Sequence, residues 1–258
     1  MKSIRVAALA TFALWILVAR LASAQPELKL ADIIRKSIDA QGGLEKMRAI
    51  KTMRSTGKII LGGGQMEAPM ITYMKRPGNT RIELSVQGQK IIEAFDGTTK
   101  WSMNPMLGGK DAQKGSEDET KAALDEVDGV EGPLVNYGEK GHSVELLGKE
   151  DVDGSMAYKL KVTLKSGNVR TIYLDDTTFL TVKLVTKVKQ AGQEFEAEML
   201  SGNYRPVEGM MMPFSTSMKV NKQIGMQMQI DKVEVNVPLE DSLFTMPEIK
   251  KVDAPKAQ

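Results

Sequence analysis

The chain of 258 residues contains no cysteine and only one histidine, His142. The missing cysteine excludes disulfides, thiolate metal sites and a cysteine nucleophile. A zinc site normally needs two or more His or Cys ligands, and no Gly-x-Ser-x-Gly sequence supplies a nucleophile that His142 could activate. We therefore expect His142, which follows Gly141 in a predicted loop, to be exposed to solvent and to have no catalytic role.

Long apolar runs are scarce as well, and the one at the N-terminus is short. Lys2 and Arg5 precede an apolar stretch over residues 6–19, and Ala22-Ser23-Ala24 has the small-residue pattern of a signal-peptidase site. The stretch of about 14 residues is shorter than the ~20 that a membrane-spanning helix needs. We predict that residues 1–24 are a signal peptide cleaved after Ala24 and that the mature protein is periplasmic. The alternative is an uncleaved N-terminal anchor.

Cleavage at this site would also remove the small surplus of basic charge. The 35 Lys and Arg residues, less Lys2, Arg5 and Arg20, stand against 33 Asp and Glu residues, which leaves a net charge of about −1. Phosphate neutralisation needs clustered Lys and Arg, so we expect no nucleic-acid partner. The same balance weakens attraction to anionic lipid, and we expect only transient membrane contact.

Patterns that support catalysis or metal binding are incomplete wherever they occur. Gly62-Gly63-Gly64 lacks the Gly-Lys-Ser/Thr of a phosphate loop and is better interpreted as a hairpin loop. Asp151, Asp153 and Gly154 resemble part of a calcium loop, but the closing bidentate Glu is missing. The aromatic content of 5% is low for a sugar-binding cleft, although acidic residues are abundant. We expect no enzyme activity, no metal and no cofactor.

The hydrophobic periodicity predicts a helical start followed by strands. Residues 28–48 have apolar positions at helical spacing, interrupted by Gln41-Gly42-Gly43, which we interpret as a cap and a tight link into a short second helix over residues 44–49. From Ile50 onward the period is two, and turn signals such as Asp96-Gly97 separate short runs. The spacing leaves no room for βαβ units.

Residues 104–140 depart from this pattern and predict a long helical insertion between strands. Ser116 and Glu119 have the spacing of a capping box, which opens a predicted helix to about Val127. A second short helical piece is predicted around Leu134, Val135 and Tyr137. Long insertions in compact domains are usually functional lids or disordered loops.

Together these patterns predict a mainly β (α+β) fold in one domain over residues 25–258. About ten or eleven strands form one antiparallel sheet that is strongly curved or nearly closed into a barrel. No internal repeat and no domain linker is evident.

Methionine is unusually frequent, with 17 residues, of which only Met1 precedes the predicted cleavage site. Several occupy alternate positions of predicted strands. Methionine is flexible and polarizable, so it lines surfaces that accept variable apolar ligands, but it also fills ordinary cores. A copper(I) site made of thioethers is a third possibility in an exported protein. The sequence does not distinguish among these three interpretations of the methionines.

The order of several short motifs resembles the LolA/LolB-like superfamily, whose members are often described as outer-membrane lipoprotein-sorting proteins. The motifs are Gln41-Gly-Gly-Leu-Glu-Lys-Met-Arg-Ala-Ile50, Tyr73-Met-Lys-Arg-Pro-Gly-Asn-Thr-Arg-Ile82, Phe95-Asp-Gly97, Trp101-Ser-Met-Asn-Pro105, Tyr204-Arg-Pro-Val-Glu-Gly-Met-Met-Met-Pro213, Asn236-Val-Pro-Leu239 and Leu243-Phe244. The resemblance implies a half-open antiparallel β-barrel with helices over its mouth and an apolar cavity for acyl chains.

On this basis we expect a periplasmic carrier that binds lipid or the acyl chains of lipoproteins for transfer toward the outer membrane, with the segment over residues 116–137 as a lid. The alternatives are a non-catalytic envelope module with a filled core, which binds a protein partner or senses a ligand, and an enzyme. The sequence does not predict the oligomeric state. The expected ligand-binding residues are Met70, Met74, Leu84, Trp101, Met212, Met218, Met226 and Met228.

Overall fold

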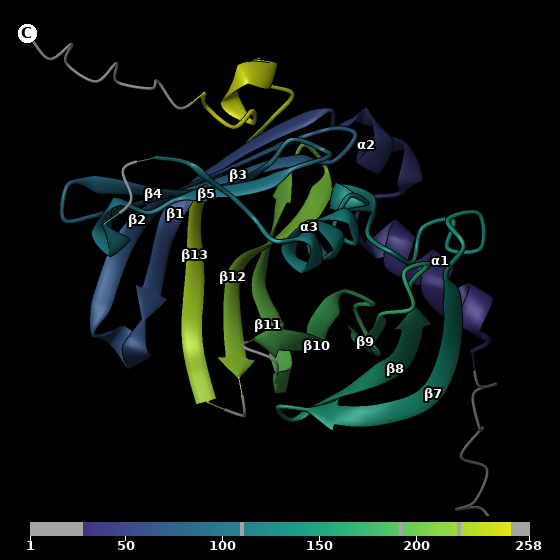
Figure 1. The fold of residues 1–258 in the computed structure, drawn as a ribbon. Coiled ribbons are helices and arrows are strands. Elements are labelled where there is room, and N and C mark those ends of the chain that lie inside the picture. The colour runs from purple at the N-terminus through teal and green to yellow at the C-terminus, as the bar shows by residue number, and fades with distance from the viewer. Residues whose placement is uncertain (1–27, 109–110, 191–192, 221–222, 249–258) are drawn as a thin grey trace, which may run out of the picture.

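Thirteen strands form one antiparallel sheet in the computed structural model, which describes residues 28–108, 111–190, 193–220 and 223–248 (Figure 1). The sheet curves strongly without closing, so the predicted mainly β, half-open architecture is confirmed. The signal peptide predicted for residues 1–24 lies outside the described residues. No helix within the described ranges is both long and apolar enough to cross a bilayer.

The strand order shows that the chain builds one half of the sheet from the middle outward and the other half from the opposite edge inward. It runs β6-β5-β4-β3-β2-β1-β13-β12-β11-β10-β9-β8-β7. The first six strands therefore lead from the centre to one edge, and the chain then crosses to the opposite edge and returns to pair β13 with β1. Because β6 and β7 are the two edges, the connection between them must span the whole sheet.

The first half of the sheet is a meander with short turns. The Asp96-Gly97 turn is confirmed, and the Asp96 carboxylate accepts hydrogen bonds from the N–H groups of Thr98 and Thr99. The glycine triplet forms a 3-10 turn, η1 (Gly62–Gly64), between two strands, as predicted for a hairpin loop. The strands are β1 (Thr52–Leu61), β2 (Met66–Lys75), β3 (Asn79–Val86), β4 (Gln89–Phe95), β5 (Lys100–Met103) and β6 (Gln113–Lys114).

The second half contains longer strands, and it brings the total to 13 rather than ten or eleven. The prediction missed β6, which has only two residues and hence no periodicity. The strands are β7 (Ser143–Val152), β8 (Ser155–Thr163), β9 (Val169–Asp175), β10 (Thr181–Gln190), β11 (Gln193–Val207), β12 (Met210–Val220) and β13 (Gln223–Val235).

The two N-terminal helices, α1 (Leu30–Ala40) and α2 (Leu44–Ala49), form as predicted, and the link between them touches the sheet. Gly42 has φ 118°, and a Cβ there would lie 2.5 Å from the carbonyl oxygen of Gly209. The Met211 N–H donates to the carbonyl of Gln41 at 3.0 Å. Only glycine permits both this backbone conformation and this close approach.

The insertion after β5 begins as predicted and ends differently. Helix α3 (Glu117–Leu124) has both halves of the Ser116–Glu119 capping box, but it ends before Val127. The helical piece predicted around Leu134, Val135 and Tyr137 is wrong, because these residues form turns. Leu134 and Val135 are nevertheless buried, so the apolar pattern marked contact with the core rather than a helix.

Helices α1 and α2 contact one face of the sheet, which we call the inner face and which is concave in Figure 1. Ile33 and Ile34 of α1 pack on a buried cluster that includes Leu160 and Ile172. The opposite, outer face carries a smaller cluster at β4 and β5, where the C-terminal segment contributes the fully buried Phe244.

Candidate ligand-binding face

The connection from β6 to β7 crosses the inner face and is fixed near both sides of the sheet. We call its residues 125–135 the strap. Arg76 at the end of β2 pairs with Glu131 of the strap at 3.0 Å. On the other side, Arg170 of β9 pairs with Glu126 and donates to the carbonyl of Asp125 at 3.3 Å. The strap therefore bridges two parts of the curved sheet that are far apart in strand order.

Arg76 also ties the strap to the helices. Its guanidinium donates to the carbonyls of Ile50 and Met47, at 2.7 and 2.9 Å, where α2 ends. These contacts satisfy carbonyls at a helix C-terminus, where a cation is also favoured by the helix dipole. One side chain thus joins β2, α2 and the strap.

His142 belongs to this arrangement, and its predicted exposure is wrong. Its side chain is only 11% exposed, with Nε2 at 3.5 Å from the Asp128 carboxylate. Its Nδ1 accepts the backbone N–H of Lys165 at 3.0 Å. Lys140 pairs with the same carboxylate at 2.8 Å. The glycine before His142 had suggested an open loop, whereas the loop is folded against the base of the strap.

The inner face has two ends with different surroundings. The covered end lies beneath α2 and the strap, where Met47, Ile50 and Val135 form one cluster with residues of β12. Further along the same strands lies the open end, where the methionine side chains are partly exposed. Cross-strand register places three of them side by side there: Met199 pairs with Met218, and Met218 pairs with Met226.

The register also shows where each predicted ligand-binding residue lies. All of them share the inner face except Trp101, which lies on the outer face. The Trp101 indole N–H donates to the carbonyl of Phe244 at 2.7 Å, and its ring is almost fully buried. Met74 and Met212 lie at the covered end. Met70 of β2 and Leu84 of β3 are cross-strand neighbours. Met218, Met226 and Met228 lie at the open end.

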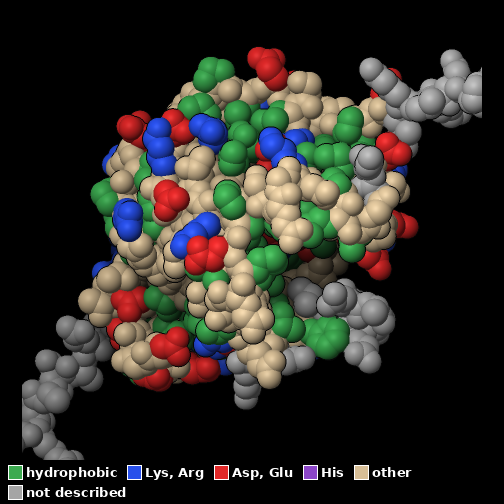
Figure 2. Space-filling model, turned by 90° about the vertical axis from the view of Figure 1, so that its left-hand side faces the viewer, with side chains coloured by type: hydrophobic (Ala, Val, Ile, Leu, Met, Phe, Trp, Pro, Cys, Tyr) green, Lys and Arg blue, Asp and Glu red, His purple; other side chains and the backbone are tan. Residues whose placement is uncertain are grey.

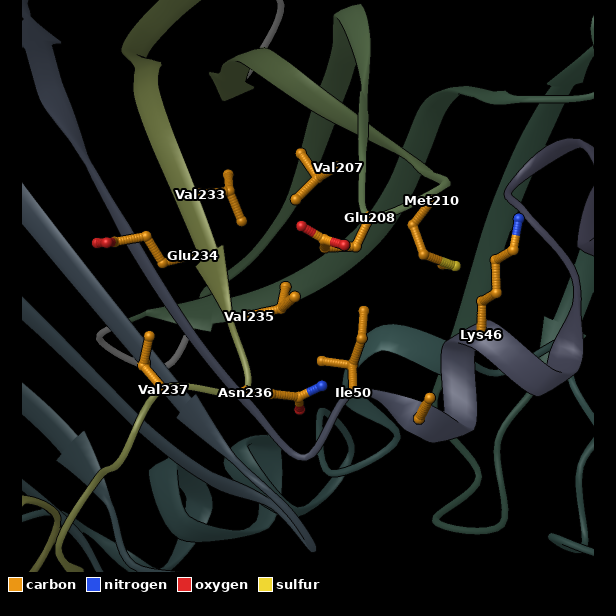
Figure 3. Close-up of a pocket in the computed structure, with 11 residues that line it drawn as sticks. Lys46, Ile50, Val207, Glu208, Met210, Val233, Glu234, Val235, Asn236 and Val237 are labelled. Carbon is orange, nitrogen blue, oxygen red and sulfur yellow. The ribbon is translucent and has the colours of Figure 1, made fainter.

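A pocket of about 550 Å³ lies where β12 and β13 separate, close to α2 (Figure 3). Its lining includes Ile50, Val207, Met210 and Val235. The sequence prediction missed it, since separation of two strands leaves no periodic signal. Pro213 within β12 was an available sign, because proline inside a strand favours an unpaired edge.

Potential metal ligands do not cluster in the described part of the chain. No group of three or more His, Asp or Glu residues among them could hold a metal ion. Burial raises the pKa of Tyr204 to about 12, so its hydroxyl stays neutral and donates to the carbonyl of Thr181 at 2.6 Å. On the face seen in Figure 2, Lys and Arg side chains lie among Asp and Glu side chains.

Similar folds occur in solved structures, whereas no family model and no curated protein sequence matches this chain. A LolA superfamily protein from Nitrosomonas europaea aligns with a TM-score of 0.55 and 13% identity, over 84% of this chain and 98% of that one. A DUF1329 family protein from Desulfovibrio piger gives 0.57 and 14%, over 83% and 96%.

The chain has the fold of the LolA superfamily. A domain from Vibrio parahaemolyticus, described as a candidate outer membrane lipoprotein-sorting protein, agrees, with a TM-score of 0.54 and 14% identity over 83% of this chain and 94% of that one. The resemblance predicted from the motifs is therefore confirmed for the fold. At these identities the likeness extends to the path of the backbone and not to individual ligand contacts.

Proposed function

We propose that this protein is a non-catalytic periplasmic carrier that binds lipid, or the acyl chains of lipoproteins, on its inner face for transfer toward the outer membrane. The observation that carries the proposal is the open end of the inner face. There, aligned methionine side chains remain partly exposed instead of packing beneath a helix. An apolar surface held inside a curved sheet suits an apolar chain better than a polar substrate.

The physical gain from such a site is large enough for tight binding. Each CH₂ group removed from water contributes about 0.8 kcal/mol, so a long acyl chain contributes roughly 10 kcal/mol before its ordering costs. Thioether side chains have three rotatable bonds and can follow chains of different shape. The row formed by Met199, Met218 and Met226 therefore supports a site that is tolerant of chain length and branching.

Release of the ligand requires an opening step, and helix α3 is the element suited to it. The strap that follows α3 is held by the ion pairs of Arg76 and Arg170 and by the buried side chains of Leu134 and Val135, so it stays with the core. Helix α3 itself has no buried residue, so it can move without exposing a core. Lids of this kind commonly control exchange of a ligand with its surroundings.

The experiment compares single aspartate substitutions in delipidated protein. We expect Met226→Asp and Met228→Asp to lower the affinity for a fluorescent acyl-chain probe at least tenfold, because a charge in an apolar site is strongly disfavoured. Met106→Asp is the matched control, since Met106 is 46% exposed in the turn η2 (Pro105–Leu107), outside the strands. Thermal unfolding of each variant separates lost binding from lost folding.

The outcome decides between carrier and interaction module. If Met226→Asp and Met106→Asp bind the probe alike while both remain folded, the inner face is not the ligand site. The alternative function, an envelope module that binds a protein partner or senses a ligand, then becomes the better account. A folded wild-type protein with no affinity for any acyl chain leads to the same conclusion.

A further inference from the structure

The sheet divides between β12 and β13 at the covered end. The two strands pair from Ser215 with Gln229 to Val220 with Gln223, and no further among the described residues. Beyond that point β12 continues beside β11, with Met210 opposite Val207, while β13 continues beside β1, with Val235 opposite Met53. The strands thus diverge around the 550 Å³ pocket, which we call the split pocket.

The walls of the split pocket combine apolar and polar surface in about equal parts, and its volume lies within the range of small-ligand sites. Val207 and Met210 come from β11 and β12, Val233 and Val235 from β13, and Ile50 from the end of α2. Ligand sites of roughly 300–1,000 Å³ typically have apolar side chains along their walls and a few polar groups that orient the ligand, and an amphiphile uses both kinds of surface.

The backbone of β12 is poorly suited to accept another strand here. The Met211 N–H faces away from β11 and is already bonded to the carbonyl of Gln41. Side chains and backbone groups repeat every two residues along a strand, so Pro213 faces the same way, and it has no N–H. A strand added at this edge would find no donor at either position, which favours an apolar chain over an extended peptide.

Three charged residues line the split pocket, namely Lys46, Glu208 and Glu234. Glu208 is exposed to solvent, and Figure 3 shows its carboxylate pointing toward β13, whereas the Lys46 ammonium points away from the valines. Lys46 donates to the carbonyl of Gly209 at 3.4 Å, and Glu208 has no hydrogen bond or ion pair within the described part of the chain. Glu234 also lines the pocket, but Figure 3 shows its carboxylate turned to the other side of β13, where it pairs with Arg54 and Lys232.

We propose that the split pocket is a second ligand site, which binds an amphiphile with an apolar tail and a cationic amine head. The valine, isoleucine and methionine side chains would take up the tail, and the Glu208 carboxylate would accept a charge-assisted hydrogen bond from the ammonium group. The site is distinct from the open end of the inner face, where Met226 and Met228 lie.

The test uses dodecylamine, dodecanol and dodecanoate as probes below their micelle concentrations, with methyl-¹³C methionine NMR as the readout. Met210 lines the split pocket, whereas Met226 and Met228 report on the open end. We expect the Met210 methyl signal to respond to the amine with an affinity about 3- to 10-fold higher than to the alcohol, and least to the carboxylate. Raising the salt concentration should reduce this preference.

Two matched substitutions locate the charge responsible. Glu208→Gln should make the amine and the alcohol bind equally, while Glu234→Gln should keep the wild-type preference because its carboxylate faces the other way. Val235→Trp should fill the pocket and abolish the Met210 response. If that variant does not fold, the two glutamine variants still decide the question.

The proposal is overturned if no probe moves the Met210 signal, or if Glu208→Gln and Glu234→Gln behave alike. It also predicts that Met228→Asp leaves the Met210 response to dodecylamine unchanged. The two proposals can therefore be tested separately, since loss of acyl-chain binding at the open end would not affect the result for the split pocket.

Discussion

Met212 and Met218 lie on the same face of β12, yet one is core and the other is part of a candidate site. Met212 is 9% exposed at the covered end, where it belongs to a cluster with Met47 and Phe214. Met218 lies at the open end beside Met199 and Met226 and keeps part of its surface exposed. The residue type is the same, so function follows from which end of the strand the helices and the strap cover.

The largest expected contrast concerns stability at the two ends. Met47→Ala should destabilise the protein by about 2–5 kcal/mol, because it leaves a cavity around a side chain with no exposed surface. Met218→Ala should cost less than about 1 kcal/mol, since its side chain is already in contact with solvent. Urea unfolding of both variants measures the difference, and equal losses would contradict the division into two ends.

A smaller effect is expected where the strap is fastened. Arg170→Met should cost about 1–3 kcal/mol, because Arg170 is 7% exposed and its bonds to Glu126 and the Asp125 carbonyl would be lost. Arg54→Met is the control, since its pair with Glu234 on the outer face is partly exposed and should contribute less than about 1 kcal/mol. Chemical denaturation gives both values. Faster hydrogen exchange confined to the strap in Arg170→Met would show that Arg170 holds the strap in place.

Helix α3 should respond locally rather than globally. Ser116→Ala removes the capping hydroxyl that accepts from the Glu119 N–H, which should cost about 1 kcal/mol of helix stability. No residue of α3 is buried, so the unfolding midpoint of the sheet should stay the same. Hydrogen exchange resolved by residue checks this, and a large drop in the midpoint would show that α3 belongs to the core.

The smallest expected effect is a dependence of α3 on acid. Hydrogen bonds from the Ser116 N–H and hydroxyl hold the pKa of Glu119 below its usual value. The resulting stabilisation is therefore present above the unfolded pKa of about 4.3 and is lost as the pH falls through the lower folded pKa. NMR of α3 between pH 6 and 3 should show fraying at the acid end. Glu119→Gln should remove this pH dependence.

The sequence predicted the elements with strong local signals. The capping box at Ser116, the Gln41-Gly42-Gly43 link and the Asp96-Gly97 turn are all present, because each depends on bonds between near neighbours. The strand count and the second helix of the insertion were wrong. They depend on contacts between distant parts of the chain, such as those that bury Leu134 and Val135 without a helix.

The candidate site was predictable only in part, for a similar reason. Alternation separates a strand into two faces but does not say which face is the inner one. Trp101 is buried although it lies on the outer face, because the C-terminal segment brings Phe244 against it. No periodicity in the sequence predicts that contact. The methionines of β12 and β13 do share the inner face, yet only register and coverage distinguish Met226 from Met212.

The most direct test of the central claim is native mass spectrometry, with lipid extraction, on the protein purified from cells that produce it. The proposed carrier function predicts near-stoichiometric acylated species, which Met226→Asp should lose and Met106→Asp should keep. A mass corresponding to the protein alone, unchanged after incubation with phospholipid and lipoprotein, would contradict it.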